Sequence, residues 1–277
     1  MVKELESKKR LLTHLLPYLF LFLVVGCHPG HQVRYGFATV KSPDGSFYEG
    51  ELRNGVFNGK GKITYADGAT YEGDFQDGQP HGVGKRNYSD GSSYEGEFRG
   101  GKLHGKGRFV EEGFLYEGDF IRGKPHGFGI LELKDGTRYE GEFRDGSYDG
   151  EGTLISGRGD KYEGSFREGS PNGEGRFICR DGREIVGEFR DGLVHGRAAA
   201  AYPNGDRYIG GFKDNEWEGH GILRYRNGNI YEGQFKGGYF HGHGRFIFHE
   251  TGEIVEGEWE KGEYVNDPSI EIPTPGI

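Results

Sequence analysis

The chain has 277 residues, of which 54 are glycine, and only 33% of its residues are hydrophobic. Aromatic residues are numerous, with 17 tyrosines, 20 phenylalanines and 2 tryptophans, so the composition excludes a thick aliphatic core but allows rings to pack on glycine backbone in a thin layer. The formal net charge of −9, with no compact Lys/Arg run beyond the N-terminal segment, argues against nucleic acid as a partner because phosphates would be repelled.

The first 26 residues differ in kind from the rest of the chain. A basic cluster, Lys8-Lys9-Arg10, precedes an apolar run from Leu11 to Val25, and Gly26 follows. A positive region, an apolar region and a small residue in this order are typical of a signal peptide. The apolar run spans about 15 residues, fewer than the roughly 20 that a membrane-spanning helix needs. Residues 1–26 are therefore predicted to be a signal peptide.

The end of this segment, Val24-Val25-Gly26-Cys27, resembles the lipobox of bacterial lipoproteins. The resemblance implies that Cys27 becomes the lipid-modified N-terminus, which would anchor the protein in a membrane of the bacterial cell envelope. The alternative is an uncleaved signal anchor, which would make the chain a single-pass membrane protein with a coincidental cysteine. Residues 27–45 are predicted to hold the linker to the lipid anchor and an N-terminal capping strand.

A Tyr-Glu-Gly motif recurs through the remainder of the chain. It begins at residues 48, 71, 94, 116, 139, 162 and 231, and degenerate copies begin at 185, 208 and 255. The spacing is 23 residues, with one spacing of 22 and one of 24. A fixed period of this length predicts a repeat architecture in which no single unit can close a core alone.

Each unit is predicted to contain two strands and two turns. An apolar or aromatic residue lies two positions after the motif glycine, and an Asp-Gly or Gly-Gly turn follows in most units, as expected for a hairpin. A second glycine pair, such as Gly82 and Gly84, then leads into a short run rich in strand-forming residues. The predicted core aromatics of the repeats are Tyr48, Tyr71, Phe75, Tyr94, Phe98, Tyr116, Phe120, Tyr139, Phe143, Tyr162, Phe166, Tyr208, Phe212, Tyr231, Phe235 and Trp259.

Residues alternate between the two faces of each predicted strand. In the unit that begins at residue 71, Tyr71, Gly73 and Phe75 share one face, and Glu72 and Asp74 share the other. One face of the sheet should therefore carry rings and glycine, while the other carries charge. The predicted fold class is all-β: an elongated single-layer antiparallel β-meander built from about ten hairpin repeats.

The pattern Y-E-G-x-F/W-x-x-G-x-x-x-G-x-G at this spacing resembles the MORN repeat over residues 46–262. This resemblance implies an antiparallel meander of hairpins and an association with membranes, protein scaffolding and some lipid contact. Residues 263–277 lose the pattern and carry Pro268, Pro273 and Pro275, so they are predicted to form a C-terminal cap and a flexible tail. The open ends of such a sheet would permit an end-to-end homodimer.

The candidate chemical groups are better explained by structure than by catalysis. His81, His104, His126, His195 and His241 share one repeat position that elsewhere holds Asn, Asp or Glu, which favours a polar turn position over a metal site. The repeated glutamates form a ladder of equivalent pairs rather than one catalytic pair. Cys179 occupies a strand position and is predicted to be a small buried hydrophobe. We therefore expect no enzyme activity, no metal and no cofactor.

The leading functional hypothesis is a membrane-tethered scaffold that binds protein partners. The alternative is an envelope protein that binds a glycan or lipid along the aromatic groove of the sheet. Rings buried against one another would favour the scaffold, whereas a row of exposed rings would favour the ligand-binding protein.

Overall fold

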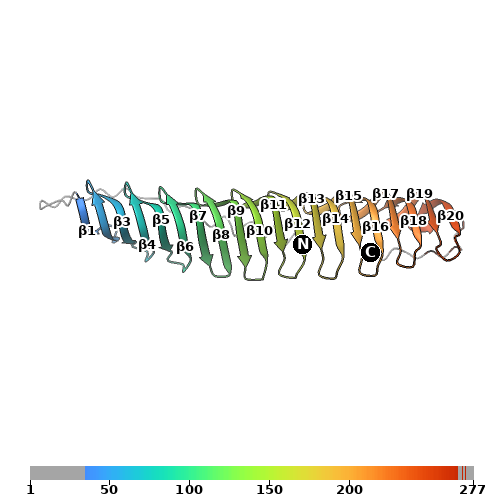
Figure 1. Ribbon diagram of the computed structural model, residues 1–277, viewed down its shortest axis with the longest axis horizontal. Coiled ribbons are helices and arrows are strands. Elements are labelled where there is room, and N and C mark those ends of the chain that lie inside the picture. Colours follow the sequence, from blue (N-terminus) through green and yellow to red (C-terminus); the bar gives the residue numbers. More distant parts are fainter. Residues whose placement is uncertain (1–34, 268–269, 271, 273–277) are drawn as a thin grey trace. The chain divides into compact units, whose positions relative to one another are not determined.

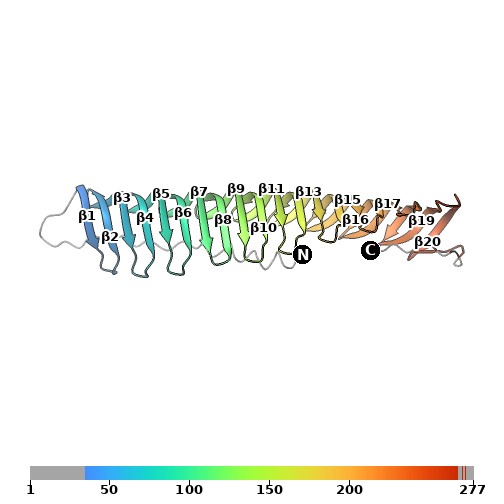
Figure 2. The same ribbon diagram turned by 60° about the horizontal axis from the view of Figure 1, so that its bottom comes forward.

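The computed structural model describes residues 35–267, 270 and 272, and every regular element among them is a β-strand. The strands divide between two compact units, one within residues 6–148 and one from Asp149 onward, and each unit is considered separately. Within each unit, the strands lie side by side in chain order (Figures 1 and 2). The predicted signal peptide and Cys27 lie outside the described residues.

The strands are short, and most contain seven to ten residues. In the first unit they are β1 (Tyr35–Lys41), β2 (Phe47–Arg53), β3 (Val56–Thr64), β4 (Thr70–Gln76), β5 (Gln79–Asn87), β6 (Ser93–Arg99), β7 (Lys102–Glu111), β8 (Phe114–Ile121), β9 (Lys124–Leu133) and β10 (Arg138–Arg144). The next strand along the chain is β11 (Ser147–Ile155). In the second unit follow β12 (Lys161–Arg167), β13 (Ser170–Ile178), β14 (Glu184–Arg190), β15 (Leu193–Ala201), β16 (Arg207–Lys213), β17 (Glu216–Arg224), β18 (Ile230–Lys236), β19 (Tyr239–Ile247), β20 (Ile254–Glu260) and β21 (Glu263–Tyr264).

The strands of each unit pair antiparallel with their neighbours in sequence. In the first unit the pairings run from β1–β2 to β9–β10, and in the second they run from β12–β13 to β20–β21. The predicted all-β antiparallel meander of hairpin repeats is therefore confirmed. Each Tyr-Glu-Gly segment lies in the first strand of a hairpin, and the second glycine pair lies in the return strand.

Two kinds of turn alternate along the chain. The turn between β4 and β5 has two residues, Asp77 and Gly78, and both have positive φ, at 50° and 80°. Such turns match the twist of a two-stranded ribbon. The longer connection between β3 and β4 is different, because Gly68 has a φ of 88° while Asp67 does not have positive φ. Asp67 instead accepts a hydrogen bond from the amide of Ala69 at 2.9 Å, which stabilises the loop locally.

Each hairpin that begins with a Tyr-Glu-Gly strand or its degenerate copy carries a bulge in the described pairings, except β20–β21. In β4–β5, Gly73 pairs with Gly84 and Phe75 pairs with Pro80, so Asp74 alone faces the three residues His81, Gly82 and Val83. Gly82 has a φ of 60°, a conformation that glycine adopts without strain. The second glycine pair therefore marks a bend in the return strand.

Neighbouring hairpins are also joined through their turns. The amide of Gly78 donates to the carbonyl of Phe57 in the preceding hairpin, and the amide of Gly101 donates to that of Pro80, each at 2.9 Å. Equivalent bonds in the second unit join Gly192 to Pro171 at 2.9 Å and Gly238 to Trp217 at 3.0 Å. Each turn is thus held by the hairpin before it.

Candidate functional site

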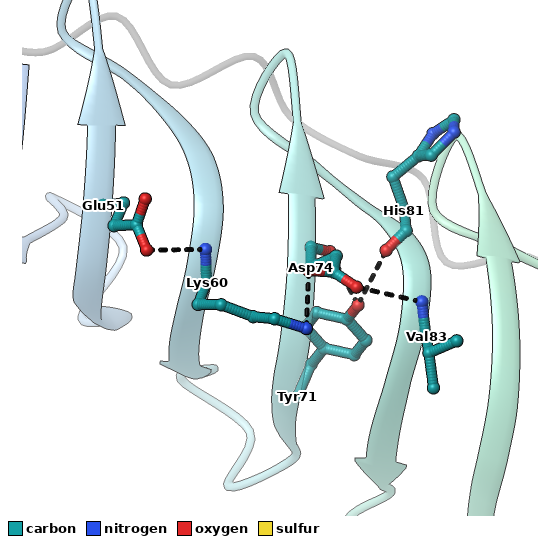
Figure 3. Close-up of polar contacts among 6 residues, drawn as sticks. All are labelled: Glu51, Lys60, Tyr71, Asp74, His81 and Val83. Atoms are coloured by element: carbon teal, nitrogen blue, oxygen red, sulfur yellow. Dashed lines mark hydrogen bonds and ion pairs between the residues drawn. The ribbon is translucent and has the colours of Figure 1, made fainter.

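The most regular cluster, present in most hairpins, is a tyrosine ring that lies on a pair of glycines. The Tyr71 hydroxyl donates to the carbonyl of Asp74 at 2.7 Å and approaches the carbonyl of His81 at 3.4 Å (Figure 3). A Cβ atom on Gly84 would lie 2.5 Å from the Tyr71 hydroxyl, so only glycine leaves room for the ring. Burial is the largest cause of the raised pKa of the Tyr71 hydroxyl, which keeps it protonated as a hydrogen-bond donor.

The rings of neighbouring hairpins pack edge to face. The Tyr71 ring contacts Phe75 of its own strand at a centroid distance of 5.1 Å and Phe98 of the next hairpin at 4.9 Å, with interplanar angles of 84° and 79°. Tyr94 repeats this arrangement with Phe98 and Phe120. These angles place the positive edge of one ring against the negative face of another, which favours each contact beyond its buried area.

The structure places all sixteen predicted core aromatics in this layer. None is more than 5% exposed, and Tyr48, Tyr71, Tyr94, Tyr116, Tyr139, Tyr208 and Tyr231 are 0% exposed. We call the face of the sheet that carries them the inner face and the opposite face the outer face. Because these rings cover one another, they present no open row on which a sugar or an acyl chain could stack.

In several hairpins a carboxylate closes the bulge from the outer face. The carboxylate of Asp74 accepts the amide hydrogen of Val83 at 3.2 Å and forms an ion pair with Lys60 at 2.7 Å (Figure 3). Glu51 accepts from the amide of Lys60, and Glu97 from the amide of Lys106, at 3.3 and 3.0 Å. In these hairpins the residue after the motif glycine thus satisfies an amide that the bulge leaves without a strand partner, whereas β16 has Gly211 at this position. Sequence reasoning missed this role and placed Asp74 only on a solvated charged face.

The shared histidine position lies within a strand, not in a turn as predicted. His81 begins the bulge of β5, and its side chain points away from Tyr71 while its carbonyl faces that ring (Figure 3). At two of these positions the histidine ring reaches the turn of the following hairpin. The His126 ring accepts from the amide of Asp145 at 3.4 Å, and the His195 ring lies 3.2 Å from Asp214. In these two cases the histidine side chain links one hairpin to the next, and this contact explains why the residue is polar.

Along the outer face, one row of residues alternates in charge from strand to strand. In the first unit the register aligns Glu49, Lys62, Glu72, Lys85 and Glu95 on successive strands. Lys62 lies 3.4 Å from Glu72, and Lys85 lies 3.6 Å from Glu95. All four side chains of these two pairs are more than half exposed, so each pair adds little to stability. The repeated glutamates predicted from sequence thus lie in a solvated ladder.

Arg86 and Cys179 are two irregular positions on the inner face. Arg86 occupies the position held by Ile63 in the preceding hairpin and is only 7% exposed. Its guanidinium lies 5.2 Å from the centroid of the Tyr65 ring and 4.9 Å from that of Tyr88, and its Nε has no hydrogen-bond acceptor among the described residues. Cation–π contacts offset part of the cost of burying this charge.

The second irregular position is Cys179, a free thiol that is 9% exposed. Burial raises the pKa of the Cys179 thiol, which opposes formation of a reactive thiolate. The thiol borders an open depression of about 460 Å³ whose lining residues are Asp160, Phe177, Cys179, Arg180, Asp181 and Arg183. Within the described residues, no three His, Cys, Asp or Glu side chains are grouped so as to hold a metal ion. The described part of the chain also contains no helix long and apolar enough to cross a membrane.

These observations define the class of protein: a repeat protein built from β-hairpins, in which the same packing of a tyrosine ring on two glycines recurs along the chain. The chain belongs to the MORN repeat family, as its sequence predicted. The family model matches nine segments, residues 48–70, 71–93, 94–110, 116–138, 139–161, 162–182, 186–207, 208–230 and 231–250. No curated protein sequence matches the chain.

Three solved structures show low similarity to the chain. The G-box domain of the microcephaly protein CPAP is 13% identical, with a TM-score of 0.33 over 81% of this chain and 100% of that one. The SAS-4 (dCPAP) TCP domain of Drosophila melanogaster, solved with a proline-rich motif of Ana2, is 15% identical, with a TM-score of 0.22 over 87% and 97% of the two chains. A streptogramin B lyase is 14% identical, with a TM-score of 0.15 over 80% and 68%. Scores this low carry no inference about function.

Proposed function

We propose that this MORN-repeat protein is a non-catalytic scaffold, tethered to a membrane by its N-terminal segment, that binds protein partners. The observation that carries the proposal is the burial of the core aromatics, none of which is more than 5% exposed. The surface offered to a partner is then the outer face with its loops, where charged side chains predominate. Such a surface suits protein recognition, in which exposed charges set the orientation and the rate of encounter.

The repetition of the polar groups supports a function without catalysis. The Tyr71 hydroxyl, the Asp74 carboxylate and the bulge amide of Val83 all have equivalents in the neighbouring hairpin, namely Tyr94, Glu97 and Lys106. Each of these groups already contributes to holding the bulge. In a catalytic pair of carboxylates, the two groups have different environments, and this difference gives one the role of acid and the other the role of base. The groups of neighbouring hairpins have matching environments instead.

The tether rests on the resemblance of residues 24–27 to a lipobox. Its test is the intact mass of the protein extracted from membranes, measured for the wild type and for Cys27→Ala. A mature chain that begins at Cys27 and carries acyl mass, both lost in the variant, is the expected result and would assign the protein to the bacterial cell envelope. A chain that retains Met1 in both proteins would overturn the lipoprotein and support the uncleaved signal anchor.

Partner binding is tested by placing a photo-crosslinking residue at single positions in cells. Glu72 and Glu95 probe the exposed outer ladder, and Gly91, in an exposed loop where an added Cβ would meet no atom within 4 Å, serves as a reference site. Discrete protein adducts at the ladder positions, above those at Gly91, are expected. The scaffold would be refuted if no ladder position formed an adduct while the purified protein bound glycans or lipid vesicles, which would favour the ligand-binding alternative.

A further inference from the structure

The charge-alternating row of the outer face is interrupted in the second unit. There the register aligns Glu163, Arg176, Val186, Ala199, Ile209, Ile222, Glu232 and Arg245 on β12 to β19. Four adjacent strands, β14 to β17, thus carry apolar residues, whereas the row in the first unit carries Glu, Lys or Arg on every strand from β2 to β10 except β9, which has Ile130. We call Val186, Ala199, Ile209 and Ile222 the apolar stripe.

The apolar stripe faces solvent. Ile209 is 62% exposed and Val186 is 46% exposed, although both lie in the middle of a strand. At the spacing of paired strands, the four residues extend about 14 Å across the sheet. Ala199 is exposed as well, and Ile222 is half-buried. A contiguous row of aliphatic side chains that reach solvent on a highly charged surface is typical of an interaction site.

The charged residues on the two sides of the apolar stripe are arranged so that the row, when reversed, places opposite charges beside one another. On the β14 side the row reads Arg176 and then Glu163, while on the β17 side it reads Glu232 and then Arg245. Reversing the row about its centre, between β15 and β16, therefore brings a residue of opposite charge to each flanking position. A second copy of this chain supplies that reversed row.

We propose that the apolar stripe is a self-association surface, on which a second copy packs face to face about a twofold axis parallel to the strands between β15 and β16. In this dimer the two stripes cover each other, as in aligned packing of two sheets. Arg176 faces Glu232 of the second copy, and Glu163 faces Arg245 of the second copy. The contact is isologous, because both copies use the same surface.

The existing ion pairs are compatible with this arrangement. Arg245 lies 2.6 Å from Glu232, and Arg176 lies 2.7 Å from Glu184 and 4.0 Å from Glu163, each within one chain. In the dimer, each end of the stripe would hold four charges that alternate in sign around a square. Each carboxylate would then have two cationic neighbours, which increases the attraction without breaking the original pair.

The direct test restores the charged ladder inside the stripe. The double variant Ile209→Glu with Ile222→Lys gives these strands the residue types that Glu72 and Lys85 provide in the first unit, so the fold should accept it. The full chain is solubilised in mild detergent, and its dimer dissociation constant is measured by sedimentation over a concentration series. The variant should weaken dimerisation by at least about 100-fold, because the dimer covers Ile209 of both copies and burying each of these exposed side chains contributes roughly a tenfold factor. Glu72→Lys with Lys85→Glu is the matched control and should leave the constant unchanged.

A pairing experiment then tests the axis. One chain carries Arg176→Glu with Arg245→Glu, so that its flanks are acidic, and a second carries Glu163→Lys with Glu232→Lys, so that its flanks are basic. Each chain alone should dimerise more weakly than the wild type, and an equimolar mixture should form heterodimers.

Three results would overturn the proposal. The wild type could remain monomeric throughout the concentration series. Its dimer could persist in the Ile209→Glu, Ile222→Lys variant, which would point to association through the sheet ends or the N-terminal segment. The acidic and basic chains could fail to pair with each other, which would reject the twofold arrangement.

Discussion

The contact between Tyr71 and Gly84 allows a quantitative test of what holds each hairpin together. An alanine Cβ at Gly84 would lie 2.5 Å from both the Cε2 and the hydroxyl oxygen of Tyr71, whereas ordinary contacts lie between 3.4 and 4 Å. Gly84 does not have positive φ, so the backbone itself can accept alanine. The cost of Gly84→Ala therefore comes from displacing the tyrosine.

The magnitude follows from two contributions. Forcing an extra methyl into a packed core costs about 1–3 kcal/mol. Moving the ring also weakens the hydrogen bond from its hydroxyl to the Asp74 carbonyl, worth about 1 kcal/mol. We expect Gly84→Ala to destabilise the β4–β5 hairpin by about 2–4 kcal/mol in total. Gly91→Ala, in a loop with φ of 89° and no atom within 4 Å, should cost only about 1–2 kcal/mol from its backbone conformation.

One hairpin of the chain already carries a pair of residues that avoids the clash between the tyrosine ring and an alanine methyl group. In the hairpin of β14 and β15, Ile185 replaces the tyrosine and Ala198 replaces the glycine that pairs with Gly187. Tyr71→Ile alone should cost about 2–4 kcal/mol through lost packing. Combined with Gly84→Ala, it should cost about 2 kcal/mol less than the sum of the two single changes, because the new methyl no longer meets a ring.

Hydrogen exchange of the β4 and β5 amides is the appropriate assay, because a repeat protein can open locally rather than in one step. The four chains of the cycle are compared under the same conditions, with the amides of β18 and β19 as an internal reference. Additive costs for the two substitutions would show that the tyrosine and the glycine act independently, and would refute the steric role assigned to the glycine pair.

Three further outcomes are expected. Asp74→Ala should lower the protection of the Val83 amide by about 1 kcal/mol, whereas Asp74→Asn, which keeps an acceptor, should lower it less; equal loss in both would contradict the bulge contact. Arg86→Leu should raise the thermal midpoint, because a buried cation whose Nε has no hydrogen-bond acceptor among the described residues is replaced by an apolar residue; a lower midpoint would show that the contacts of the guanidinium with the two tyrosine rings stabilise the sheet. Burial raises the pKa of Tyr48 to about 12, so the stability from keeping it neutral is complete below its unfolded pKa near 10 and is lost as pH rises through 12. Alkaline titration by tyrosinate absorbance and circular dichroism together should show ionisation coupled to unfolding, and ionisation without unfolding would contradict that burial.

The repeat and its faces could be predicted from the sequence because both depend on local periodicity. Alternation placed Tyr71 and Phe75 on one face, and the glycine between them indicated a slot for a ring. The same alternation placed Arg86 on the inner face with Ile63, so its burial could have been recognised. What the alternation did not indicate was that its guanidinium would lie between two tyrosine rings.

The bulge could not be predicted in the same way. It shifts the register between the two strands of a hairpin, so a residue such as Asp74 faces three residues rather than one. Its carboxylate appears solvated in a regular strand pattern, and only the shifted register brings it to the Val83 amide. The histidine position was wrongly assigned to a turn for the same reason, because a glycine next to a polar residue indicates a turn and a bulge equally well.

The bonds from each turn to the preceding hairpin have a consequence for how such a protein changes in length. Gly78 bonds to Phe57, and Gly101 bonds to Pro80, so each hairpin is secured to its neighbour by the same contact. Removing one whole repeat from the interior of a unit therefore joins two surfaces that already fit and leaves no backbone group unpaired, whereas removing half a repeat exposes a row of amides and carbonyls. Genetic duplication or deletion can accordingly adjust the number of binding positions in whole repeats, without requiring a new core each time.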